Sequence, residues 1–179
     1  MPLKDLLFGF EGRIRRRDWW LWGIGLGVAW FAASIALGRL LFGPAWAEAQ
    51  LSGVPITGNW SMTAFGLASF VPLLWVHTAL AAKRAHDRNR GALIAVGLTA
   101  LAGLATFVPE VVDLVTASSL TDSQFNTLSM AVNSGNLVVN MYLVVVLGFL
   151  DGTQGPNRFG RSPKGIGGDP ADKAAEVFS

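Results

Sequence analysis

The chain has 179 residues, of which 51% are hydrophobic and 15% charged, and it contains no cysteine. This composition excludes a disordered chain and a water-soluble domain of average usage. The missing thiols exclude disulfides, thiolate nucleophiles and thiolate metal sites. The formal net charge of +2 is small, but the basic residues are unevenly distributed, and the composition indicates a membrane protein of one domain.

Four apolar runs have lengths close to the roughly 20 helical residues that cross a hydrocarbon core. They occupy residues 19–42, 61–82, 92–108 and 128–150, with a candidate extension of the third to Val115. Only helices and closed barrels satisfy backbone polar groups in lipid, and runs without strict alternation favour helices. The sequence therefore predicts an all-α integral membrane protein, with a small bundle of four transmembrane helices in residues 1–164 and a mobile cytoplasmic tail at 165–179.

The basic residues predict the orientation of these spans. Thirteen of the fourteen Lys and Arg residues precede the first run, lie between the second and third, or follow the fourth. By the positive-inside rule, both termini are expected in the cytoplasm. The first run is too long for the core of a cleavable signal peptide, so we interpret it as an uncleaved anchor.

The segments on the opposite side are predicted to be external loops. Residues 43–60 combine Gly, Pro and polar residues, which favours a turn-rich loop with Trp46 and Trp60 at interface depth. Residues 109–127 contain acidic and capping residues, and a short amphipathic piece is compatible with this segment.

Small residues recur at helix-contact spacing in the first span. Gly23 and Gly27 form a G-x-x-x-G pair, and Ser34 and Gly38 are also four residues apart. Such spacing permits close helix packing. Packing within the chain is the preferred explanation, and a dimerisation face is the alternative.

Polar side chains interrupt two predicted spans. Asn133, Asn136 and Asn140 are spaced by three and four positions, so they share one face of the fourth helix, which should point inward. His77 lies in the inner half of the second span. These residues could line a path in a small transporter or channel. Interhelical hydrogen bonding is preferred for the asparagines, whereas for His77 packing and function stand equal.

The sequence contains no convincing motif for catalysis, cofactor binding or metal binding. Residues 155–162, GPNRFGRS, resemble a phosphate loop only superficially, because Arg replaces Lys and the strand-loop-helix context is absent. His77 and His86 lack metal-ligand spacing. We therefore assign no catalytic, cofactor-binding or metal-binding residue and expect a protein that is not an enzyme. Only His86 and Asp87 could supply acid-base chemistry to a lipid-headgroup enzyme, the third-ranked alternative.

Three polar segments carry a family resemblance. They are FEGRIRRRDWW at 10–20, KRAHDRNRG at 83–91 and DGTQGPNRFGRSP at 151–163. Together they resemble the bacterial inner-membrane family called domain of unknown function 805, with signatures F-x-G-R-x-x-R, R-x-H-D and G-T-x-G-x-N-x-F-G-x-D-P. The resemblance covers about residues 3–164, although Ser162 replaces the usual Asp and Leu93 a frequent Trp. It implies a multi-pass protein of the bacterial inner membrane and carries no established biochemical activity.

All three segments fall on the predicted cytoplasmic side, where they can converge into one polar cap. In this interpretation residues 83–91 form a short loop between two spans. The candidate cap residues are Arg13, Arg16, Arg84, His86, Asp87, Asn157 and Arg158. The preferred explanation is that the cap fixes helix ends, because buried charges need partners.

A sharper hypothesis is that the surplus arginines bind an anion, either a phospholipid headgroup or a small phosphate. We expect the partners to be membrane lipids, anionic ones included, another membrane protein or a second copy of the chain, and we expect no nucleic acid. The sequence therefore predicts an accessory or structural membrane component that binds through the cap, with a small transporter or channel as the first alternative.

Overall fold

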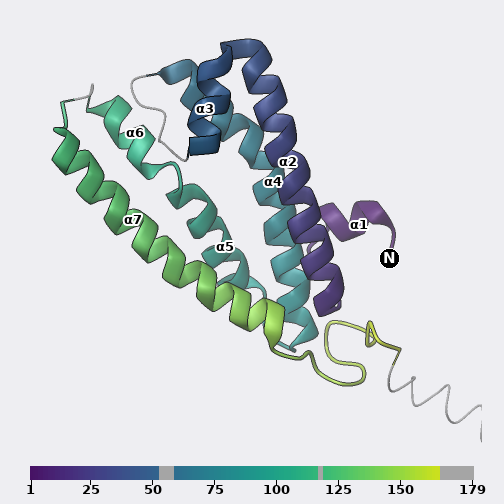
Figure 1. The fold of residues 1–179 in the computed structure, drawn as a ribbon. Helices are drawn as coiled ribbons and strands as arrows, with labels where there is room; N and C mark the ends of the chain where they lie inside the picture. Colours follow the sequence, from purple (N-terminus) through teal and green to yellow (C-terminus); the bar gives the residue numbers. More distant parts are fainter. Residues whose placement is uncertain (53–58, 117–118, 166–179) are drawn as a thin grey trace, which may run out of the picture. The chain divides into compact units, whose positions relative to one another are not determined.

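The structure is a computed structural model that describes residues 1–52, 59–116 and 119–165. These residues form helices and connecting segments, with no strand among them (Figure 1). The elements in chain order are α1 (Leu3–Phe8), α2 (Arg16–Phe42), α3 (Pro44–Ser52), α4 (Trp60–Asp87), α5 (Leu93–Ala105), α6 (Val108–Val115), α7 (Asp122–Leu143) and the π-helix η1 (Val144–Phe149). The prediction of an all-α chain is confirmed.

Three of the described helices are long and apolar enough to cross a membrane: α2, α4, and α7 together with η1. The pair α5 and α6 passes the same test jointly, with a bend of 50° at its break, so the number rises to four if this pair is one span. The third predicted span, 92–108, thus corresponds to α5, and its candidate extension to Val115 forms a second helix, α6, after Thr106 and Phe107.

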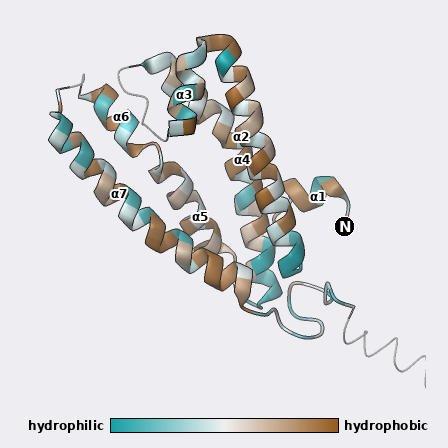
Figure 2. Ribbon diagram, in the orientation of Figure 1, coloured by the Kyte–Doolittle hydropathy of each residue, from teal (hydrophilic) through white to brown (hydrophobic). Residues whose placement is uncertain are grey.

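Apolar side chains cover the outside of these helices. In the most apolar stretch of α2, only 11% of the residues are buried, and the share is the same in the helix formed by α7 and η1. Leu40 and Leu93 are 81% and 85% exposed, and apolar residues dominate the middle of the long helices in Figure 2. Exposed apolar surface on this scale is uncommon in water-soluble monomers, so these helices are suited to apolar surroundings.

Two segments predicted as loops are helical. Lys83–Asp87 form the last turns of α4, so the interpretation of residues 83–91 as a loop is wrong for its first five residues. Their charged side chains are held by tertiary contacts, which allows the helix to continue past the apolar run. Pro44–Ser52 form α3, so residues 43–60 are not simply turn-rich; residues 53–58, and most of the predicted tail at 165–179, lie outside the described residues.

The chain divides into two compact units. Unit 2 comprises Ile24–Leu74 and Ala100–Met141. Its core contains Trp46, which is 2% exposed. The prediction that Trp46 lies at the interface with the surroundings is therefore wrong. The indole Nε1 donates to the Ser34 carbonyl at 3.0 Å, and Gly38 leaves the space that the ring occupies. The Ser34 and Gly38 spacing thus serves packing within the chain.

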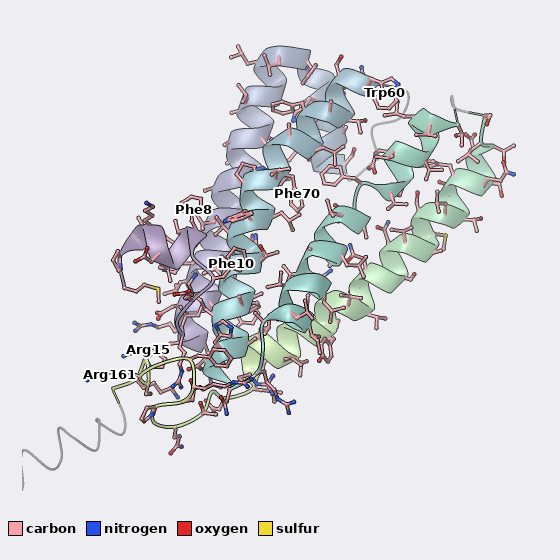
Figure 3. The ribbon with its side chains drawn as sticks, turned by 180° about the vertical axis from the view of Figure 1, so that it is seen from behind. Phe8, Phe10, Arg15, Trp60, Phe70 and Arg161 are labelled. Carbon is pink, nitrogen blue, oxygen red and sulfur yellow. The ribbon has the colours of Figure 1, made fainter. Side chains whose placement is uncertain are left out.

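Unit 1 comprises Met1–Gly23, Trp75–Thr99 and Tyr142–Ser179. Its apolar core is rich in small side chains of α4, where Ala79, Ala81 and Ala82 are at most 1% exposed. Such small residues allow neighbouring backbone to approach closely. Phe10 packs edge-on against Trp75, with ring centroids 5.3 Å apart, and lies beside α4 in Figure 3. The polar segments identified in the sequence all belong to this unit.

Candidate functional site

The centre of the polar cap is an ion pair between Arg13 and Asp87. Arg13 Nε and Nη2 donate to Asp87 Oδ1 at 3.1 and 3.0 Å. The side chains are 1% and 6% exposed. The remaining Arg13 donors reach carbonyls of the C-terminal segment, namely Thr153 O at 2.8 Å, Gly155 O at 2.8 Å and Gly160 O at 3.1 Å. One guanidinium therefore joins three regions that are distant in sequence.

Arg84 lies on the other side of the same carboxylate. Its Nη1 donates to Asp87 Oδ2, its Nε to Leu147 O at 2.7 Å, and its Nη2 to Leu150 O. The side chain is fully buried. Two buried guanidinium groups thus share one carboxylate, and the backbone carbonyls that both arginines also reach provide further negative partial charge.

The carbonyls at the end of η1 all find side-chain donors. Between the two Arg84 contacts, Gly148 O accepts from Trp20 Nε1 at 3.2 Å and Phe149 O accepts from Arg16 Nη1 at 2.9 Å. A helix leaves its last four carbonyls without intrahelical partners, and the end of its dipole favours cations. Two arginines and a tryptophan therefore cap the helix end by satisfying four consecutive carbonyls.

The segment after η1 folds back over Asp87. Thr153 N donates to Asp87 O at 2.8 Å, and Asn157 Nδ2 donates to His86 O at 2.9 Å. Gly152 lies so close to the Asp87 carboxylate that a Cβ at this position would collide with it. This contact explains why a glycine is needed here, and it closes the cap over the ion pair.

His86 lies at the edge of the cap. Its ring stacks on Phe159, with centroids 3.9 Å apart and planes 11° apart. Its Nδ1 is 3.2 Å from Gly12 O, and because a carbonyl only accepts, this nitrogen carries the proton. The guanidinium carbon of Arg158 lies over the Phe159 ring, 4.7 Å from its centroid, and Arg158 Nη2 donates to Asn89 O at 3.4 Å.

Lys83 ties the N-terminal helix to α4. Its side chain is buried, and Nζ donates to Leu6 O at 2.9 Å and to Gly9 O. Trp75 Nε1 donates to Phe8 O at 3.2 Å. A cation near a helix C-terminus satisfies free carbonyls and interacts favourably with the dipole. The short helix α1 is thus held by contacts at its C-terminal end.

The structure brings all seven predicted cap residues together in unit 1, but their environments differ. Arg13, Arg84 and Asp87 are buried and engaged with protein groups, whereas Arg16 and its partner Asp151 are 43% and 66% exposed. Asp87 accepts at both carboxylate oxygens. The proposed acid-base pair of His86 and Asp87 gains no support from this arrangement, since the carboxylate is committed to two arginines.

The predicted intramembrane polar residues belong to different units. His77 belongs to unit 1, where its Nε2 is 3.3 Å from Gly23 O. Asn133, Asn136 and Asn140 belong to unit 2. Asn140 Nδ2 donates to Asn136 Oδ1 at 2.8 Å, and Asn133 and Asn140 are exposed rather than directed inward. Asn136 and Asn140 therefore bond to each other along their own helix.

Sequence reasoning missed several residues that shape this region. Lys83 was used only as a basic residue that predicts orientation, and Trp20 only as part of the segment 10–20, although each donates to a backbone carbonyl of another segment. Arg88 and Arg90 were counted for the orientation but were not named among the cap residues. The available signal was the number of cations in residues 83–91, which exceeds what Asp87 can pair. Among the described residues, no three His, Cys, Asp or Glu side chains are placed to hold a metal.

The fold and the site define an all-helical protein whose apolar helices end in one buried arginine-aspartate network. Residues 7–161 match the family described as "Protein of unknown function (DUF805)". The chain belongs to this family, as the three polar segments indicated.

The chain is 32% identical over 173 residues to "Uncharacterized protein YiiR" of Escherichia coli (strain K12), with 93% of each chain covered. The protein of the same name in Escherichia coli O157:H7 gives the same values. No solved structure is significantly similar.

Proposed function

We propose that this chain is a multi-pass protein of the bacterial inner membrane, with four spans and both termini in the cytoplasm. The apolar exterior of α2, α4, α5 and α7 supports membrane insertion. The concentration of basic residues in the three cap segments supports the orientation. The bent pair α5 and α6 then acts as one span.

Its role is that of a non-enzymatic structural or accessory component that binds lipid or another membrane protein through the polar cap. The observation that carries this proposal is the buried Arg13–Asp87–Arg84 network. All three side chains form hydrogen bonds to other groups of the protein, and these bonds join the segment before α2, the end of α4, and η1 with the segment that follows it. A network of this kind fixes a binding surface, whereas catalysis would need a group left available to a substrate.

The experiment is gentle extraction of the tagged full chain from native membranes, followed by mass spectrometry of every protein and lipid that co-purifies. We expect the chain in the inner-membrane fraction, resistant to carbonate, with a protein or lipid in stoichiometric amount. Arg13→Gln should reduce the co-purifying species, whereas Arg17→Gln, at a side chain 75% exposed, should not.

Release of the chain by carbonate would contradict membrane insertion. Purification of the intact chain without any stoichiometric protein or lipid would contradict the accessory role. Solute flux that appears only in proteoliposomes containing the chain would replace it with the transporter alternative.

A further inference from the structure

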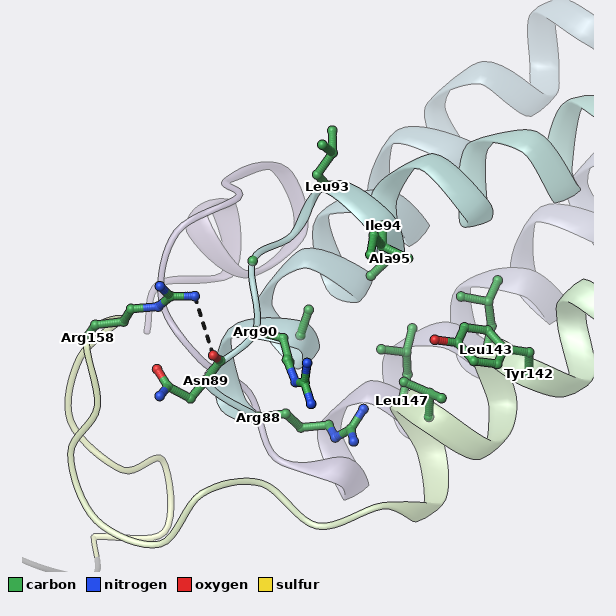
Figure 4. A pocket seen from close by; sticks show the side chains of 13 residues that line it. Arg88, Asn89, Arg90, Leu93, Ile94, Ala95, Tyr142, Leu143, Leu147 and Arg158 are labelled. Atoms are coloured by element: carbon green, nitrogen blue, oxygen red, sulfur yellow. Dashed lines mark hydrogen bonds between the residues drawn. The ribbon is translucent and has the colours of Figure 1, made fainter.

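A pocket of about 720 Å³ lies in unit 1 beside the polar cap. It is formed by the end of α4, the turn that follows, the first residues of α5 and the residues around the junction of α7 and η1. This volume lies within the range of roughly 300–1,000 Å³ typical of small-molecule sites. Figure 4 shows its side chains.

One part of the pocket is strongly basic. Arg88, Arg90 and Arg158 line it, and no acidic residue does. None of these three arginines forms an ion pair within the described part of the chain. In Figure 4 the side chains of Arg88 and Arg90 extend to one side of the turn, whereas Arg158 reaches Asn89 O from the other side. Unlike Arg13 and Arg84, these cations have no carboxylate partner among the residues that the structure describes, so they can neutralise an added anion.

Arg88 supplies an unsatisfied donor. Its Nε is buried and has no hydrogen-bond partner among the described residues. A buried N–H without an acceptor costs free energy comparable to a lost hydrogen bond. An anion with several oxygens would satisfy this donor, and a phosphate suits the planar fork of an arginine.

The rest of the pocket is apolar. Leu93 and Ile94 of α5 and Leu147 of η1 line it, together with the ring of Tyr142. Leu93 and Ile94 are 85% and 68% exposed. Leu93 and Ile94 follow the basic turn closely in sequence, and all four residues line the same pocket as Arg88 and Arg90, so one ligand can contact both the cations and the apolar wall.

We propose that this pocket binds an anionic phospholipid, with the headgroup phosphate at Arg88 and Arg90 and the start of an acyl chain along Leu93, Ile94 and Tyr142. This inference rests on the proposed membrane location and names the lipid class for the cap. A free phosphate shares the headgroup chemistry, but it would leave the apolar wall unused. The location fits as well, because basic side chains at the cytoplasmic ends of spans meet the anionic leaflet.

The test uses the full chain in a non-ionic detergent and counts bound lipid by native mass spectrometry. The probes are phosphatidylglycerol and phosphatidylcholine with identical acyl chains. Wild-type protein should prefer the anionic lipid. Arg88→Gln with Arg90→Gln should reduce that preference roughly 25-fold, from about fivefold for each arginine.

The matched control is Lys4→Gln with Arg17→Gln, which removes the same charge at exposed positions outside the pocket. It should retain the preference. Arg90→Gln alone, at an exposed side chain, should lose about fivefold, and it keeps the test valid if the double variant unfolds. Leu93→Gln should weaken both lipids without changing the preference.

If the pocket variant and the control lost the preference for the anionic lipid equally, the proposal would be overturned, because the preference would then come from general surface charge. Displacement of phosphatidylglycerol by inorganic phosphate at equal concentration would assign the pocket to a free phosphate instead. The double variant should still reach the membrane and co-purify any protein partner. If wild-type protein reached the membrane and co-purified a partner but showed no preference for the anionic lipid, this inference alone would be wrong. If wild-type protein did not reach the membrane, the proposed function would be wrong as well.

Discussion

Arg13 and Asp87 are 74 positions apart, yet two guanidinium nitrogens of Arg13 share one carboxylate oxygen of Asp87 at 3.0 and 3.1 Å. Arg84 occupies the other oxygen. The buried cluster therefore has two positive charges and one negative charge. The effect of each substitution follows from the charge that it leaves behind.

Asp87→Asn should be the most destabilising change in the cap, because it leaves two buried guanidinium groups without a carboxylate. We expect a loss of about 3–5 kcal/mol in the free energy of unfolding, the range for breaking a buried pair. Arg13→Gln should cost less, since Asp87 keeps Arg84 as its partner. Thermal and denaturant unfolding of the detergent-solubilised chain would measure both.

The double variant Arg13→Gln with Asp87→Asn restores the native net charge of the cluster. Its loss of stability should therefore be smaller than the sum of the two single losses. Additive losses would show that the two side chains stabilise the protein independently, contrary to the geometry.

Gly152→Ala should destabilise the cap, because the added methyl group would collide with the Asp87 carboxylate. Overpacking of this kind costs about 1–3 kcal/mol. Gly97→Ala is the control, since a Cβ there meets nothing within 4 Å, and it should be neutral or stabilising in a helix. A neutral Gly152→Ala, measured as the shift of the thermal midpoint, would disprove the tight closure over Asp87.

Arg84→Lys should destabilise although it preserves the charge. A single ammonium group lacks the fork that reaches Asp87, Leu147 O and Leu150 O together, and each buried carbonyl left without a donor costs about 1–3 kcal/mol. The same substitution at the exposed Arg16 should cost less than about 1 kcal/mol. Similar losses at the two positions would refute the capping role of Arg84.

The absence of cysteine makes the orientation directly testable. Leu51→Cys and Gln154→Cys introduce single thiols at exposed positions. A membrane-impermeant maleimide should label Leu51→Cys in intact spheroplasts, and Gln154→Cys only after lysis. The reverse pattern would place both termini outside the cytoplasm.

Much of the helical architecture could be predicted because apolar runs and span length are properties of local sequence. The boundaries depended on contacts that the sequence does not display. Helix α4 continues through Lys83 and Arg84 because carbonyls of α1 and η1 accept from their side chains. Similarly, α3 packs its Trp46 against Ser34 O and Gly38, although its composition favours a loop.

The candidate site could be predicted as a set of residues but not as a set of pairs. Charge and the family signatures pointed to Arg13, Arg84 and Asp87. Which arginine takes which carboxylate oxygen depends on how three distant segments meet, and this also decides which cations remain for a ligand. Arg88 and Arg90 emerged only once the buried arginines were seen to be occupied.

The three cap segments also have an order in time. Arg13, Arg84 and Asp87 leave the ribosome before the carbonyls of Leu147, Thr153, Gly155 and Gly160 that complete their bonding. During synthesis, the ion pair therefore lacks its carbonyl partners until the C-terminal segment has been made. A chain that ended before residue 147 would leave the donors of Arg13 and Arg84 without these carbonyls, whereas the finished chain covers the ion pair.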